Sequence, residues 1–368
     1  MTIILAPDKF KGSLTAEQVT QIEKSAVLEV IPDANIICVP LADGGEGTVS
    51  ALTTANGGSI FRESVSGPLF QKVDAAIGIA GDTAFLEMAE ASGMTLLDAA
   101  ERDPMKTSTF GTGEMINKVL SLGITQIIIG IGGSATVDGG TGMAEALGFK
   151  FYDADNNQLT NLCGGMLQKI ANIDSSCANP LLKKCKIKIA SDVTNPLLGP
   201  NGAVAVFAPQ KGATPEMMPE LEKGLANLRR LLLEQGFVTS DSPGDGAAGG
   251  LGLGLRAFCN ALPESGASLA IAATGLEEKI KSADLLITGE GCSDSQTDNG
   301  KLCAVVAEMC RKHNTPCILL SGKIPGGDFP AFTKTYATVS PDMPFEEIKP
   351  RAKELLRLAA MKLAQELK

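Results

Sequence analysis

Both ends of the chain repeat the same order of a short apolar strand, a polar loop and a helix. Near the start, Thr2–Ala6 precedes the helix Ala16–Val30, and near the end Asp284–Thr288 precedes the helix Leu302–Lys312. Strands that alternate with helices form parallel sheets with helices on both faces. We therefore predict an α/β domain whose parallel sheet is built from both termini of the chain.

The pattern changes in the middle of the chain. Short strands joined by glycine turns are expected there, among them Phe61–Val65 and Thr83–Met88, and this texture is typical of a mixed sheet. A chain of 368 residues is also long for one hydrophobic core. We therefore predict one domain formed by residues 1–60 and 283–368, and a second α/β domain inserted at residues 61–282.

Charge and composition exclude several classes of function. The net charge is −10 and no basic run occurs, so nucleic acid is not an expected partner. No apolar run approaches the roughly 20 residues of a membrane-spanning helix. Nine cysteines without a C-x-x-C pair, and no signal peptide, predict reduced thiols and a cytoplasmic location. His313 is the only histidine, which excludes histidine triads and histidine-rich metal sites.

A glycine-rich loop, residues 132–143, follows the apolar strand that begins at Ile127. Exposed backbone N–H groups and the start of a helix attract phosphate, and glycine lets an anion approach the backbone closely. Asp138 would repel a bare phosphate but accept one that carries Mg²⁺. The candidate phosphate-binding residues are Gly132, Gly133, Ser134, Thr136, Gly139 and Gly140. The simpler interpretation is a loop whose glycines are needed only for tight turns.

Acidic residues recur beside Gly, Ser or Thr in several loops that follow predicted strands. They are Asp8, Asp43 with Glu46, Asp138, Asp192, Asp245, and Glu290 with Asp294. Lysines lie near some of them, namely Lys9, Lys11, Lys106, Lys211 and Lys301. Carboxylates bind Mg²⁺, and lysine neutralises a transferring phosphoryl group. Any one of these acids could simply cap a turn or a helix, but their recurrence favours one shared site for phosphoryl transfer.

Two other functions fit parts of the sequence. The stretch Gly130–Ala135 satisfies the dinucleotide pattern G-x-G-x-x-A, with Asp153 or Asp155 about twenty residues on. That pattern would make the chain an NAD(P)-dependent oxidoreductase, but it leaves the other acidic loops unused. A noncatalytic nucleotide sensor is the second alternative. No P-loop sequence G-x-x-x-x-G-K-[ST] and no protein-kinase H-R-D sequence occurs.

Five motifs, in order along nearly the whole chain, resemble the bacterial glycerate kinase type-1 family. They are Ala6–Ser13, Ala42–Thr48, Gly132–Met143, Ser191–Pro196, and Thr288–Gly291 with Asp294–Gln296. The resemblance implies ATP-dependent phosphorylation of D-glycerate, to 2-phosphoglycerate or alternatively 3-phosphoglycerate. It also implies a flavodoxin-like domain that carries a large inserted α/β domain of the restriction-enzyme-like type. Cys292 departs from the pattern, because arginine is common there, so a cation at this position is not expected.

Residue chemistry then suggests roles in a cleft between the two domains. Asp192 is the preferred general base and Asp8 the alternative, because no usable histidine exists. Lys9 and Lys11 would hold the glycerate carboxylate. Substrate hydroxyl groups would bind Ser191, Thr194 and Asn195, and the nucleotide would also contact Gly289, Glu290 and Gly291. The expected ligands of Mg²⁺ are Asp138, Asp294 and Asp43. The cofactors are therefore ATP and Mg²⁺, and the oligomeric state is left open, with a homodimer among the options.

Overall fold

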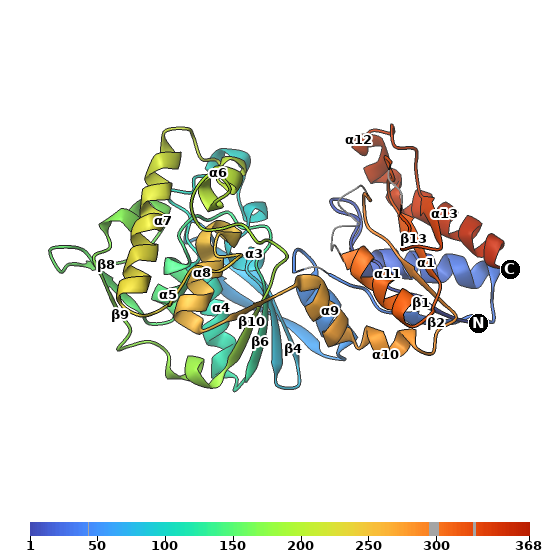
Figure 1. Ribbon diagram of the computed structural model, residues 1–368, viewed down its shortest axis with the longest axis horizontal. Helices are drawn as coiled ribbons and strands as arrows, with labels where there is room; N and C mark the ends of the chain where they lie inside the picture. The colour runs from blue at the N-terminus through green and yellow to red at the C-terminus, as the bar shows by residue number, and fades with distance from the viewer. Residues whose placement is uncertain (43, 294–301, 327–328) are drawn as a thin grey trace. The chain divides into compact units, whose positions relative to one another are not determined.

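The computed structural model describes residues 1–42, 44–293, 302–326 and 329–368. The chain forms two compact units (Figure 1). The first unit is made of Met1–Asp43, Ser50–Gly57 and Gly266–Lys368. The second unit is made of Gly44–Val49 and Gly58–Ser265. The domain limits taken from the sequence stay a prediction. No helix in the described part of the chain is long and apolar enough to cross a membrane.

The first unit contains a five-stranded sheet with the order β2-β1-β12-β13-β14. Its strands are β1 (Thr2–Leu5), β2 (Asn35–Cys38), β12 (Leu285–Thr288), β13 (Cys317–Ser321) and β14 (Lys334–Ala337). All neighbouring strands pair in parallel. Counted along the chain, this is the order 2-1-3-4-5 of flavodoxin-like folds. The predicted parallel sheet, built from both ends of the chain, is confirmed.

Helices cover both faces of this sheet (Figure 1). They are α1 (Ala16–Val30), α2 (Thr48–Ala55), α9 (Gly266–Thr274), α10 (Leu276–Ile280), α11 (Leu302–Lys312), α12 (Phe345–Ile348) and α13 (Ala352–Leu367). Alternation along β1 sends Ile3 and Leu5 into the core formed with α1 and α13. Ile4, which is also fully buried, points to the opposite face. Burial on both faces explains why these strands are continuously apolar.

The second unit contains a six-stranded mixed sheet with the order β11-β10-β6-β5-β4-β3. Its strands are β3 (Ser59–Ser66), β4 (Lys72–Ala80), β5 (Thr83–Glu87), β6 (Gln126–Gly130), β10 (Lys186–Ala190) and β11 (Leu262–Glu264). From β11 to β5 the neighbours are parallel, whereas β4 is antiparallel to β5 and to β3. A smaller antiparallel sheet has the order β8-β7-β9. Its strands are β7 (Lys150–Tyr152), β8 (Gln158–Leu159) and β9 (Asn172–Asp174). The predicted mixed sheet is confirmed.

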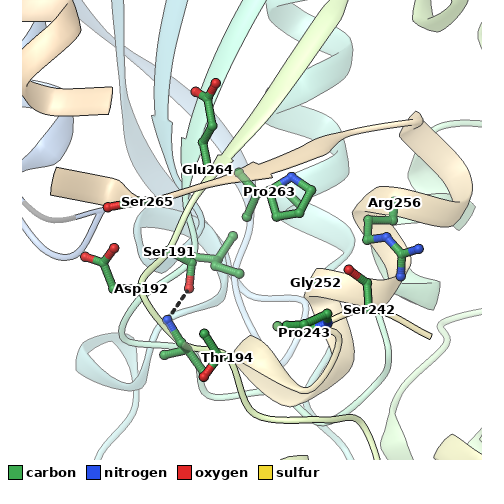
Figure 2. Close-up of a pocket in the computed structure, with 14 residues that line it drawn as sticks. Ser191, Asp192, Thr194, Ser242, Pro243, Gly252, Arg256, Pro263, Glu264 and Ser265 are labelled. Atoms are coloured by element: carbon green, nitrogen blue, oxygen red, sulfur yellow. Dashed lines mark hydrogen bonds between the residues drawn. The ribbon is translucent and has the colours of Figure 1, made fainter. Parts of the chain in front are cut away.

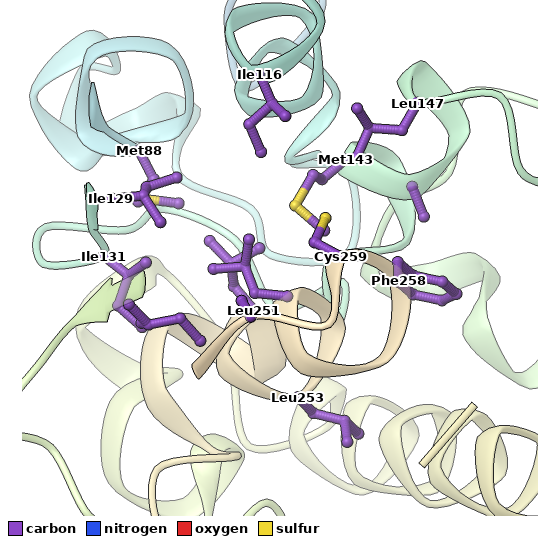
Figure 3. Packing of buried hydrophobic residues seen from close by; sticks show 14 of the residues in the cluster. Met88, Ile116, Ile129, Ile131, Met143, Leu147, Leu251, Leu253, Phe258 and Cys259 are labelled. Atoms are coloured by element: carbon purple, nitrogen blue, oxygen red, sulfur yellow. The ribbon is translucent and has the colours of Figure 1, made fainter. Parts of the chain in front are cut away.

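One large hydrophobic core joins the sheet of the second unit to its helices. The helices are α3 (Ala89–Ser92), α4 (Phe110–Ser121), α5 (Thr141–Ala146), α6 (Ala203–Phe207), α7 (Met217–Glu234) and α8 (Ala247–Cys259). Figure 3 shows members of this core, with Ile129 of β6 beside Met88, Leu251 of α8 in the middle of the view and Ile116 of α4 above them. This packing holds β6 and the residues that follow it in place.

The carboxyl ends of the parallel strands in the second unit lie at one level. Glu87 of β5 pairs with Gly130 of β6, which pairs with Ala190 of β10, and Ala190 pairs with Glu264 of β11. The loops that leave these strands therefore begin side by side. In α/β proteins, ligands bind at this edge of a sheet.

Candidate active site

A short segment of the second unit, Gly44–Val49, lies against these strand ends. The N–H of Gly132 points at the carbonyl oxygen of Gly44, with a nitrogen–oxygen distance of 3.4 Å. A Cβ atom added at Gly44 would lie 2.3 Å from the carbonyl oxygen of Ala190, and Gly44 has a φ of +90°. Only glycine fits this left-handed backbone and this close approach. Glycine at this position therefore brings the segment onto the ends of β6 and β10.

Glu87 fixes the same segment from the end of β5. The N–H of Val49 donates to its Oε1 at 2.8 Å, and the N–H of Gly47 donates to its Oε2 at 3.2 Å. The side chain is buried. A carboxylate that accepts N–H groups at the start of a helix also interacts favourably with the helix dipole. Glu87 therefore anchors the segment Gly44–Val49 beside the glycine-rich loop.

A cavity of about 390 Å³ opens at the ends of β10 and β11. Figure 2 shows Ser191 and Asp192 on one side of it and Ser242 and Arg256 on the other. The remaining lining residues are Ile131, Ile189, Val193, Thr194, Pro243, Gly244, Gly252, Pro263, Glu264 and Ser265. The walls thus combine apolar side chains with a few polar groups, which is the usual composition of a small-molecule site.

Polar groups at the two sides of the cavity differ in their exposure. Asp192 is exposed, and beside it the N–H of Val193 donates to Ser191 Oγ at 3.2 Å. On the other side, Arg256 forms an ion pair with the buried Asp245, whose side chain is 2% exposed. The arrangement offers an accessible carboxylate opposite a guanidinium that already has an anionic partner.

Asp138 lies in the glycine-rich loop but is fully buried. Its Oδ2 accepts hydrogen bonds from the N–H and the Oγ1–H of Thr109, at 2.8 and 2.7 Å, and from the N–H of Gly142 at 3.3 Å. Its Oδ1 accepts the N–H of Gly140 at 3.1 Å. Burial raises the pKa of Asp138, and these hydrogen bonds oppose the shift. In this arrangement Asp138 ties α4 and α5 to the loop.

Lys211 lies beneath the same loop and is 2% exposed. Its Nζ donates to Ser134 Oγ at 2.7 Å and to the carbonyl oxygen of Thr136 at 2.8 Å. Burial lowers the pKa of Lys211 to about 7, and the negative charge of Asp138 opposes the shift. The loop is therefore held by a buried cation and a buried acid, while Gly132 and Gly133 stay exposed.

The first unit has its own group of polar loops, at the ends of β1 and β12. The N–H of Asp8 donates to the carbonyl oxygen of Gly289 at 2.8 Å, and Lys9 Nζ lies 3.6 Å from Asp8 Oδ1. A Cβ atom added at Gly291 would lie 3.0 Å from the backbone nitrogen of Lys11. These two loops therefore run in contact, as the parallel pairing of β1 with β12 requires.

Comparison with known proteins identifies the family. The model of the glycerate kinase family matches residues 3–368. The chain belongs to this family. A glycerate 2-kinase from Escherichia coli (strain K12) is 47% identical over 327 residues, covering 88% of this chain and 86% of that protein. A glycerate kinase from Halalkalibacterium halodurans is 40% identical over 370 residues, covering 99% and 97%.

A solved structure of the glycerate kinase family has the same fold. It is the crystal structure of a Salmonella typhimurium LT2 protein assigned as glycerate kinase 2. The TM-score is 0.89 at 42% sequence identity, and the match covers 100% of this chain and 98% of that one. The family predicted from the motifs is confirmed, and with it the prediction of an enzyme of the glycerate kinase type.

The predicted site residues of this family member fall into one group in each unit. In the second unit, Ser191, Asp192 and Thr194 line the cavity, and Asn195 follows them with its Nδ2 donating to the carbonyl oxygen of Asn201 at 2.9 Å. The loop with Gly132, Gly133, Ser134, Thr136, Asp138, Gly139 and Gly140 starts on the neighbouring strand. In the first unit, the group consists of Asp8, Lys9, Lys11, Gly289, Glu290 and Gly291.

Two predicted metal ligands, Asp43 and Asp294, lie outside the described residues. Among the residues that are described, no group of three His, Cys, Asp or Glu side chains could hold a metal ion. Glu290 accepts the hydroxyl hydrogen of Ser293 at 3.1 Å. The roles given to these residues stay predictions.

Sequence reasoning did not single out Glu87 or Arg256, although the structure places both at the strand ends of this family member. Glu87 ends an apolar strand, Ala84–Leu86 being buried before it, and a charged residue at that point is a signal that could have been used. Arg256 gives no such signal, because its position in the cavity depends on Asp245, eleven residues away in the chain.

Proposed function

We propose that this chain transfers the γ-phosphoryl group of ATP to D-glycerate, with 2-phosphoglycerate as the favoured product. Membership of the glycerate kinase family carries the proposal. The similarity to a glycerate 2-kinase from Escherichia coli supports phosphorylation at the 2-hydroxyl. The fold also supports the proposal, because polar loops lie at the carboxyl ends of parallel strands, where α/β proteins bind their ligands. A cytoplasmic location and a homodimer stay predictions.

Asp192 is our choice for the residue that accepts or orients the proton of the glycerate hydroxyl. It is exposed on the wall of the cavity, so a substrate can reach it, and Ser191 and Thr194 beside it can bind substrate hydroxyl groups. Asp8 is the alternative base, with Lys9 beside it. Lys9 and Lys11 would bind the glycerate carboxylate, because an ammonium group forms strong, charge-assisted hydrogen bonds with a carboxylate.

Some residues of the predicted nucleotide site are suited to bind phosphate or Mg²⁺, and others are not. Gly132 and Gly133 are exposed, so their backbone can approach a phosphate, whereas Gly139 and Gly140 are buried. Mg²⁺ keeps several waters and needs only one or two carboxylates beside the phosphates, so a complete set of protein ligands is not required. Asp138 would have to exchange its present hydrogen bonds to bind a metal. Bound Mg²⁺ and lysine would neutralise charge on the transferring group.

The dinucleotide alternative fits the structure poorly. In that motif the helix begins within the glycine sequence, but here α5 begins only at Thr141, well after Gly130–Ala135. Asp153 follows β7, in the small antiparallel sheet, rather than a strand parallel to β6. Asp153 and Asp155 therefore do not follow a strand parallel to β6, where the motif places its ribose-binding acid.

The test is a direct assay of the purified protein. ATP, Mg²⁺ and D-glycerate together should release ADP in proportion to the glycerate added, and ³¹P NMR of the product should show the 2-phosphate ester. Omission of any one component should abolish the reaction. Binding of NAD or NADP at micromolar levels without ADP release would overturn the proposal in favour of an oxidoreductase.

A further inference from the structure

Lys211 is a buried cationic side chain of the second unit that the proposed mechanism does not use. Its Nζ has hydrogen bonds to Ser134 Oγ and the carbonyl oxygen of Thr136, both uncharged acceptors. No carboxylate of the described residues lies within ion-pair distance of it, and Asp138 acts on it only from farther away. An ammonium group has three donors, so one N–H of Lys211 is without a protein acceptor in the described part of the chain.

If Lys211 only held the loop in place, its side chain would not need to be charged. Removing an ammonium group from water is costly unless an anion compensates it, and a neutral side chain could fill the same volume. A buried lysine beneath a loop with exposed glycines therefore points to an anionic ligand. The charge of Asp138 offsets part of this cost, but Asp138 forms no ion pair with Lys211, and its oxygens accept hydrogen bonds from Thr109, Gly140 and Gly142.

The bond from Lys211 also determines what Ser134 can do. A lysine ammonium can only donate, so the oxygen of Ser134 must accept, and the hydroxyl hydrogen is left to point at another acceptor. Ser134 is 6% exposed and directly follows Gly132 and Gly133, which are exposed. The hydroxyl hydrogen, the backbone of the two glycines and the cation therefore lie on one short stretch of the loop.

We propose that Lys211 is a positioning residue of a phosphate site on the turn Gly132–Ser134, where it orients the Ser134 hydroxyl as a donor and supplies the positive charge beneath the turn. The ligand class is the phosphate chain of a nucleoside triphosphate. The inference rests on the proposed function, because that function supplies ATP as the ligand, and it adds the residue that makes this turn attractive to phosphate.

The experiment compares steady-state kinetics of Lys211→Met and Ser134→Ala with wild type, and uses Lys223→Met as the control. Lys223 is an exposed lysine of α7, so its removal changes net charge by the same amount without touching the loop. Lys211→Met should raise KM for ATP by about tenfold or more, as expected for the loss of hydrogen bonds that involve a charged group. KM for glycerate should stay within about twofold of wild type, and the control should match wild type in both.

The double variant Lys211→Met/Ser134→Ala tests the coupling. If Lys211 acts through Ser134, the two effects on KM for ATP are not additive, and the double variant resembles Lys211→Met alone. An unchanged KM for ATP in Lys211→Met, or equal changes in both KM values, would show a structural tie and overturn the inference. If Lys211→Met does not fold, Ser134→Ala tests the inference by itself. An unchanged KM for ATP in Ser134→Ala would also overturn the inference.

Failure of the proposed function gives a different result. In that case wild type itself shows no ATP-dependent phosphorylation of glycerate. Equilibrium binding of ATP with Mg²⁺ then still tests the phosphate site, because Lys211→Met should weaken this binding and Lys223→Met should not. Equal binding by wild type and Lys211→Met would overturn the inference independently of turnover.

Discussion

Asp192 and Asp8 show how environment separates two carboxylates that look alike in the sequence. Both follow a buried strand and both stand beside residues that can bind a hydroxyl or a carboxylate. Asp192 is exposed on a cavity wall, whereas Asp8 is 9% exposed and lies 3.6 Å from Lys9. A base must be within hydrogen-bond reach of the proton that it accepts, so exposure favours Asp192.

Replacement of Asp192 by Asn should therefore lower kcat with little change in KM for glycerate. The expected loss is roughly 10²–10⁴-fold, the range for removal of a general base. Lys9→Ala is the matched comparison, and it should raise KM for glycerate because it removes a partner of the carboxylate in both the ground and the transition state. If Asp192→Asn keeps a normal kcat while Asp8→Asn loses it, the role belongs to Asp8. If both variants keep it, no protein base is needed.

Glu23 is a buried acid with no functional role in this scheme. It lies on α1 of the first unit, is 0% exposed, and neither carboxylate oxygen has a hydrogen-bond partner among the described residues. Burial raises its pKa well above the usual value. The folded state then binds more protons than the unfolded state between the two pKa values, so stability falls as the pH rises through that window.

Glu23→Gln should accordingly be more stable than wild type at pH 8, and the gain should shrink towards pH 4.5. Each unit by which the pKa is raised corresponds to about 1.4 kcal/mol at a pH above the raised value. Urea unfolding at several pH values measures the difference. A gain that does not vary with pH would mean that Glu23 is charged in the folded protein.

At the scale of elements, the glycine-rich loop meets a second glycine-rich segment at the start of α8. The N–H of Gly139 donates to the carbonyl oxygen of Gly249 at 3.1 Å. A Cβ atom at Gly249 would lie 2.0 Å from the carbonyl oxygen of Thr136, and one at Gly254 would lie 2.5 Å from that of Gly139. For this half of the loop, glycine is required by close backbone packing, whereas Gly132 and Gly133 remain available to a ligand.

Gly254→Ala should therefore destabilise the protein. Alanine in place of glycine inside a helix is ordinarily stabilising by about 1 kcal/mol, but the added methyl group must displace the backbone of Gly139, and overpacking costs about 1–3 kcal/mol. Gly236→Ala separates this effect from backbone strain, since Gly236 has a φ of +76° and nothing within 4 Å of an added Cβ. Thermal unfolding of both variants gives the comparison. A Gly254→Ala protein at least as stable as wild type would contradict the packing argument.

At the scale of the whole molecule, Mg²⁺ is expected to serve catalysis and not folding. No group of three acidic, histidine or cysteine side chains in the described ranges could hold a metal ion, and a hydrated Mg²⁺ bound mainly through nucleotide phosphates requires none. Folding and metal binding should therefore be separable in this protein.

EDTA should abolish phosphorylation while leaving the melting temperature of the ligand-free protein unchanged. Activity should return on addition of Mg²⁺ or Mn²⁺ in excess of the chelator. A metal ion raises the melting temperature only if it binds the folded protein. Mg²⁺ that binds mainly through the nucleotide should therefore not affect the melting temperature of the ligand-free protein. Differential scanning fluorimetry with and without EDTA provides the measurement. A clear fall in melting temperature would reveal a structural metal.

Local sequence determined the parts of this protein that depend on neighbouring residues. Apolar runs mark the buried strands such as β1, β12 and β13, because a strand buried on both faces must be apolar throughout. The resumption of the strand-loop-helix order after residue 283 predicted the parallel sheet made from both termini. Five motifs of Gly, Ser, Thr and acidic residues were sufficient to predict the family.

Tertiary structure alone decided which polar groups are accessible. Asp138 and Asp192 stand in similar sequence surroundings, yet three backbone N–H groups and the Thr109 hydroxyl donate hydrogen bonds to the oxygens of Asp138, while Asp192 faces a cavity. Lys211 meets Ser134 across 77 positions of the chain, and Glu87 meets Val49 across 38. Burial and such long-range contacts arise from the packing of whole elements, and local sequence carries no record of them.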